Sequence, residues 1–109
     1  MQVWNAGITV VMGTDAGNIG TLHGPSIFRE MAMMVEAGLT PLQVLKSATV
    51  NGAAATSNPS EVGVIAAGKL ADLVIVDKNP LADIVNMSSV THVIKDGKEF
   101  TPAALLRGL

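Results

Sequence analysis

Residues 7–17 read Gly-Ile-Thr-Val-Val-Met-Gly-Thr-Asp-Ala-Gly, a short apolar run rich in β-branched residues that ends among small residues around one aspartate. The run is nearly continuous rather than alternating, which is typical of a strand buried on both faces in a parallel sheet. We therefore predict a strand over residues 7–12, with Asp15 following its carboxyl end. In a β/α barrel, side chains at this end of a strand face the active site.

Helices are predicted next along the chain. Gly24-Pro25 opens the first, because proline suits the first helical position, and Gly38 is placed to end it in the left-handed conformation. The sequence Thr-Pro-Leu-Gln at 40–43 has the form of a capping box and opens the second. A third short helix is expected over residues 50–56, and Thr49 and Asn51 are expected to hydrogen-bond around the junction between the second and third helices.

The second half of the chain has the composition of β-structure. Short strands are predicted over residues 62–65, 71–77 and 90–94, and Lys-Asp-Gly-Lys at 95–98 indicates a hairpin turn. The fold class is therefore α/β. We expect two parts, a βα part over residues 1–57 and a β-rich part over residues 58–109.

The composition is too apolar for an ordinary small domain. Apolar residues make up 49% of the 109 residues, with 11 glycines besides, and charged residues only 15% against about 25% in typical soluble domains. No apolar stretch approaches the roughly 20 residues that cross a bilayer. The first residues, Met-Gln-Val, also lack the basic segment that begins a secretory signal, so no such signal is expected. We therefore expect no membrane partner. We expect instead that the chain has apolar faces that another protein surface covers.

The charge pattern and the motifs exclude several further functions. The seven basic and nine acidic residues are scattered, so nucleic acid is not an expected partner. The chain has no Cys, no Gly-x-Ser-x-Gly sequence and no Walker A loop, and its glycines miss the spacing of dinucleotide binders. The lack of Cys fits a reducing compartment, and we expect the cytoplasm.

Asp15 is the candidate catalytic and metal-binding residue. A carboxylate at the end of a strand, among small residues, can bind a divalent cation or move a proton. It can equally cap or shape a turn. His23 and Gly24 lie in the loop on the same side and are candidate substrate-binding residues, although His23 also fits an ordinary exposed loop histidine. His92 falls in the middle of a predicted strand, where a structural role is expected.

Seven segments of the chain, in order, resemble the C-terminal part of amidohydrolase-superfamily barrels. They are Gly-Thr-Asp-Ala-Gly at 13–17, His-Gly at 23–24, Glu-Ala-Gly-Leu-Thr-Pro at 36–41, Ala-Thr-Val-Asn-Gly-Ala-Ala at 48–54, Gly-Val-Ile at 63–65, Gly-Lys-Leu-Ala-Asp-Leu-Val at 68–74 and Asn-Pro-Leu-Ala-Asp-Ile at 79–84. The pattern is similar to the imidazolonepropionase-like and Xaa-Pro dipeptidase-like branches of that superfamily.

The resemblance implies the fold and the chemistry of a metal-dependent hydrolase. It implies the last strand and helices of a (β/α)8 barrel followed by part of a small β-sandwich. It also implies hydrolysis of a C–N bond in an amide, a cyclic amide or a dipeptide. By resemblance, Asp15 is a metal ligand and the proton shuttle, with zinc the expected metal, and His23 with Gly24 flanks the substrate.

One departure from the family pattern limits this prediction. The superfamily's other metal ligands, beginning with a His-x-His motif, have no match in the chain. Because zinc sites take three or four protein ligands, we expect the chain to bind no metal by itself and to be inactive alone. Its uncovered faces predict a homo-oligomer or a strand-exchanged dimer. A non-catalytic structural or self-association module is the alternative.

Overall fold

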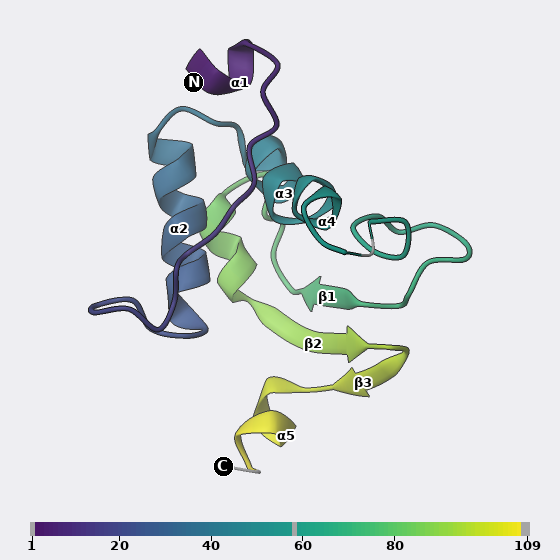
Figure 1. Ribbon diagram of the computed structural model, residues 1–109. Coiled ribbons are helices and arrows are strands. Elements are labelled where there is room, and N and C mark those ends of the chain that lie inside the picture. The colour runs from purple at the N-terminus through teal and green to yellow at the C-terminus, as the bar shows by residue number, and fades with distance from the viewer. Residues whose placement is uncertain (1, 58, 108–109) are drawn as a thin grey trace.

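The computed structural model describes residues 2–57 and 59–107 of the chain. Helices dominate the first half, and a small antiparallel sheet occupies the second (Figure 1). The elements in chain order are α1 (Gln2–Asn5), α2 (Pro25–Glu36), α3 (Pro41–Ala48), α4 (Val50–Ala54), β1 (Leu73–Val76), the 3-10 helix η1 (Ile84–Ser88), β2 (Val90–Lys95), β3 (Lys98–Phe100) and α5 (Pro102–Leu106). The mixed α/β class is therefore confirmed.

The connection between α2 and α3 follows the local signals in the sequence. Gly38 has a φ of 102°, its amide donates to the Val35 carbonyl at 2.8 Å, and the Leu39 amide donates to the Met34 carbonyl at 3.1 Å. These two bonds form a Schellman motif, which ends the helix. The capping box is also formed, since the side chain of Thr40 and that of Gln43 each accept from the other's amide.

The core lies between α2, α3 and η1. Its buried members are Met31, Leu39, Val44 and Ile84. Three of them come from residues 2–57, which contain α1 to α4 and which we call the helical half, and one comes from η1. Partly buried side chains pack around them, namely Trp4, Met12, Ala32, Met34, Val35, Leu45, Ala48 and Met87. This cluster crosses the predicted boundary after residue 57. The division into two domains stays a prediction, and Asn58, where the second begins, lies outside the described residues.

The sheet is a three-stranded antiparallel meander with the order β1-β2-β3. Asp96 and Gly97 connect β2 to β3 with φ values of 50° and 74°, and positive φ at both central residues is the conformation that two-residue hairpins favour. The hairpin turn and the strand predicted over 90–94 are confirmed, and the strand predicted over 71–77 forms in its central part, Leu73–Val76. His92 lies within β2, where its Nε2 is 3.3 Å from the Glu99 carboxylate.

The strand predicted over residues 7–12 is not formed. Residues 8–15, which we call the open segment, belong to no helix or strand, and Ile8 and Val11 are 58% and 44% exposed rather than buried. A strand exists only where a neighbour completes its hydrogen-bond ladder, and no described part of the chain lies beside the open segment as a strand. The barrel strand that the resemblance implies is therefore absent from this structure.

Two further differences concern local structure. The strand predicted over residues 62–65 is not formed: residues 62–64 are bends and residue 65 is irregular, because Gly63 has a φ of 95° and packs its backbone against α4. α1, η1 and α5 are short helices that the sequence did not predict. None of the helices in the described ranges has the length and apolarity needed to cross a membrane.

Gly63→Ala should destabilise the fold. A Cβ at this position would lie 2.6 Å from the Ala53 Cβ, and the positive φ adds strain. We expect the free energy of unfolding, measured by urea denaturation, to fall by about 2–4 kcal/mol. Gly68→Ala is the matched control, because Gly68 also has a positive φ but a Cβ there meets no atom within 4 Å. The control should cost only about 1–2 kcal/mol, and equal losses would contradict the packing role of Gly63.

The ion pair between Asp72 and Lys95, next to the hairpin turn, should make the free energy of unfolding depend on pH. The Asp72 carboxylate accepts from the Lys95 ammonium and from the Asp96 amide, and these two bonds hold the pKa of Asp72 below its ordinary value. A lowered carboxyl pKa stabilises the folded state above the ordinary pKa, and this contribution is lost as the pH falls through the folded-state pKa. Asp72→Asn should therefore be less stable than the unsubstituted chain at pH 7.

The difference in unfolding free energy between the two proteins should shrink as the pH falls through the lowered pKa of Asp72. Urea denaturation over a series of acidic pH values measures it. A difference that stays constant down to the lowest pH would show that the Asp72 charge contributes nothing to stability.

Candidate functional site

Two hydrogen bonds attach the open segment to the junction between the helices α3 and α4. The Met12 amide donates to the Ser47 carbonyl at 3.2 Å, and the Asn51 carboxamide nitrogen donates to the Val10 carbonyl at 3.0 Å. Thr49 forms the expected bond within the junction, from its hydroxyl to the Leu45 carbonyl at 2.7 Å. Asn51 instead reaches a residue 41 positions earlier, which its sequence context did not reveal.

Asp15 ends the open segment in a left-handed backbone conformation. Its φ is 50°, a value that few residues other than glycine adopt and that aspartate tolerates better than most. Its carboxylate is exposed and accepts a long hydrogen bond of 3.4 Å from the Asn18 carboxamide. This geometry is compatible with both interpretations of Asp15, a turn-shaping residue and a carboxylate available to a ligand.

His23 and Gly24 lie where the loop after Asp15 returns to α2. The Gly17 amide donates to the Thr21 carbonyl at 3.0 Å, which closes this loop, and Gly24 has a φ of 86° just before α2 begins. The His23 ring lies close to Gly17, because a Cβ built on Gly17 would be 3.0 Å from the ring Nε2. The glycine at position 17 therefore leaves room for the imidazole beside the end of the open segment.

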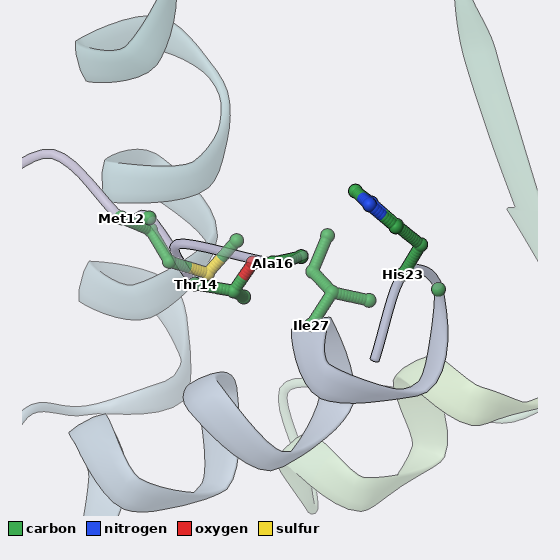
Figure 2. Close-up of a pocket in the computed structure, with 7 residues that line it drawn as sticks. Met12, Thr14, Ala16, His23 and Ile27 are labelled. Atoms are coloured by element: carbon green, nitrogen blue, oxygen red, sulfur yellow. The ribbon is translucent and has the colours of Figure 1, made fainter. Parts of the chain in front are cut away.

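The end of the open segment and His23 both line a cavity of about 350 Å³ (Figure 2). Side chains of Met12, Thr14 and Ala16 line one side, the imidazole lies on the other, and Ile27 reaches up between them from α2. Gly13 and Gly24 complete the lining. The cavity is thus largely apolar, with one hydroxyl and one imidazole as its polar side-chain groups.

Two of the three predicted site residues, the sequence neighbours His23 and Gly24, line the cavity. The third, Asp15, lies between two lining residues, Thr14 and Ala16, without lining it. A second hollow of about 290 Å³ lies beside Thr14 on the flank of α2, with Ser26, Arg29 and Glu30 in its wall. The roles predicted for Asp15, His23 and Gly24 stay predictions.

The described residues do not make a complete metal centre. In residues 2–57 and 59–107, no three His, Cys, Asp or Glu side chains are grouped so that they could share a cation. The carboxylate of Asp15 has Asn18 beside it, and a carboxamide nitrogen is a donor rather than a metal ligand. Since zinc sites need three or four protein ligands, Asp15 can supply at most one ligand of such a site.

Comparison with known proteins identifies one family. The sequence profile described as "Amidohydrolase family" matches residues 2–100. An ochratoxinase from Aspergillus niger is 33% identical over 99 residues, which cover 87% of this chain and 20% of that protein. An imidazolonepropionase from Parabacteroides distasonis is 36% identical over 99 residues, which cover 86% of this chain and 23% of that protein.

The fold is also similar to part of a larger solved enzyme. A Xaa-Pro dipeptidase crystallised with methionine in its active site superposes with a TM-score of 0.83 and 36% sequence identity. The match covers 92% of this chain and 24% of the dipeptidase. The chain thus spans about a fifth to a quarter of the length of these relatives.

Proposed function

The chain belongs to the amidohydrolase family, and from this premise we propose that it is the C-terminal portion of a metal-dependent hydrolase that cleaves C–N bonds. Its relatives are hydrolases that are four to five times longer than the matched region, which supports a contribution to a larger active site. The single observation that carries the proposal is the position of Asp15, at the end of the open segment and next to the cavity that His23 lines.

We assign two roles to Asp15 in the complete protein. As a carboxylate it is one ligand of a shared divalent cation, with zinc the expected metal. As a base it takes a proton from the attacking water and delivers it to the leaving nitrogen, the transfer that C–N hydrolysis requires. The small neighbours Gly13, Ala16 and Gly17 support both roles, because they leave the carboxylate open to a ligand.

The substrate class follows from the cavity and the relatives. We propose an amide or a cyclic amide, including a dipeptide, since the relatives include an imidazolonepropionase and a Xaa-Pro dipeptidase. The apolar walls formed by Met12, Ala16 and Ile27 suit an apolar group of such a molecule. His23 and Gly24 would flank the scissile region. A cytoplasmic location completes the proposal.

The chain by itself is proposed to be inactive. No three His, Cys, Asp or Glu side chains are grouped among the described residues, so the further ligands of a cation have to come from other parts of the complete protein. No catalytic step is therefore assigned to this chain alone.

A second candidate function is a self-association module without catalysis. The observation that favours it is the amount of apolar surface: Val74 and Ile75 of β1 are 54% and 46% exposed, and β1 is an edge of the sheet. An uncovered edge strand with apolar side chains is a template for pairing with another strand. We propose that a second copy of the chain pairs here, as a homo-oligomer or a strand-exchanged dimer.

The catalytic proposal is tested in a chimera in which residues 2–100 replace the matching quarter of the Xaa-Pro dipeptidase. Asp15→Asn in an active chimera should lower kcat for a Xaa-Pro dipeptide by at least about 100-fold, because proton transfer is lost. The chain alone, with zinc added, should hydrolyse the same dipeptide no faster than buffer does.

Asp96→Asn is the matched control in the chimera. Asp96 is also exposed and has the same φ of 50°, but it lies in the hairpin turn away from the cavity. Its substitution should change kcat by no more than about twofold. Full turnover in the Asp15→Asn chimera would refute the role of Asp15, and a folded but inactive unsubstituted chimera would count against the proposed function as a whole.

Self-association is tested by size-exclusion chromatography with light scattering. The chain should elute with a mass above the 11.2 kDa of one copy. Ile75→Lys should shift it toward the monomer, because a charge on the β1 edge opposes pairing. Leu105→Lys on α5, where the leucine is 50% exposed, is the control and should leave the mass unchanged. A compact monomer at all concentrations would remove this proposal.

A further inference from the structure

We propose that the junction between α3 and α4 is a positioning device for the loop that carries Asp15. Its two contacts are the Ser47 carbonyl and the Asn51 carboxamide, which hold the backbone of the open segment at Met12 and Val10. As a positioning role, this inference rests on the proposed function, although the contacts themselves can be tested without any activity.

The two contacts act on one side of the open segment. They lie two residues apart, at 3.2 Å and 3.0 Å, and both partners belong to the same helix junction. The opposite side of the segment has no strand beside it in the described ranges, and Val11, between the two contacts, is 44% exposed. The direction in which residues 13–15 leave the helical core is therefore set at these two points.

Burial and hydrogen bonds within the junction hold its own backbone in place. Ser47 is fully buried, and its hydroxyl donates to the Val44 carbonyl at 3.2 Å within α3. The Thr49 carbonyl accepts from the Ala53 amide at 2.8 Å, so the junction continues into α4 through a helical hydrogen bond. Asn51 lies on the first turn of α4, and its carboxamide nitrogen supplies the donor that the Val10 carbonyl needs.

The held residues lead directly to the candidate site. Met12 packs against the core cluster and also lines the cavity, and Gly13 and Thr14 continue that wall up to Asp15. A shift of the backbone at residues 10–12 would move both the cavity wall and the carboxylate. Asn51 is thus a positioning residue that acts on Asp15 through the backbone, without contact to a substrate.

The test compares two substitutions at the same junction. Asn51→Asp keeps the shape of the side chain but removes the donor to Val10, whereas Thr49→Val removes a hydroxyl bonded to Leu45 within the junction and leaves the open segment's contacts intact. Amide hydrogen exchange of Met12, followed by NMR in the full chain, reports on the open segment directly. It should become about tenfold faster in Asn51→Asp and change by less than about twofold in Thr49→Val.

A second readout separates positioning from general stability. In the dipeptidase chimera, Asn51→Asp should lower kcat about tenfold with KM within about twofold, and Thr49→Val should alter neither. Equal exchange at Met12 in the two variants, or an unprotected Met12 amide in the unsubstituted chain, would overturn the contacts. Faster exchange with an unchanged kcat would overturn the positioning role. Inactivity of the unsubstituted chimera would instead be a failure of the proposed function, and the exchange result would stand without it.

Discussion

Gly38 reverses the chain between α2 and α3, and the hydrogen bonds of Gly38 and Leu39 to the last turn of α2 hold this reversal in place. Leu39 is buried as a result, and it meets Met31 of α2 and Val44 of α3 in the core. The rest of the helical half builds on this contact. α3 ends at the junction that binds the open segment, and the open segment leads to Asp15 and the cavity. The left-handed conformation of Gly38 thus supports the candidate site indirectly, through the packing of α3 on α2.

Elements with strong local signals were predictable from the sequence. The proline and glycine at the ends of α2, the capping box of α3 and the Asp96-Gly97 turn each determine a backbone conformation through neighbouring residues alone. Which face of α3 is buried has no such local signal. Leu42 is 51% exposed, whereas Ser47 is fully buried, because the side of α3 that faces the core depends on where α2 and η1 lie.

The open segment shows what local sequence cannot decide. Its β-branched residues favour a strand, yet a strand requires a neighbour, and no described residue provides one. The same reasoning applies to the site. Asp15, His23 and Gly24 were selected by their place in the sequence, and His23 and Gly24 do line one cavity. The contact between Asn51 and Val10 joins positions 41 residues apart and has no local signal. In residues 2–57 and 59–107, Asp15 belongs to no group of three side chains that could share a cation, and no local signal in the sequence supplies the other ligands.

Ile84 is the one core residue that comes from beyond residue 57 among those the structure describes. The helical half and the residues beyond 57 are therefore joined mainly by η1, which packs against α2, and by Gly63, which packs against α4. A chain coupled through two such small contacts can lose the docking of its sheet while its helices stay associated. Its two halves would then melt as separate units, and a larger protein that enclosed both would gain stability by joining them into one cooperative body.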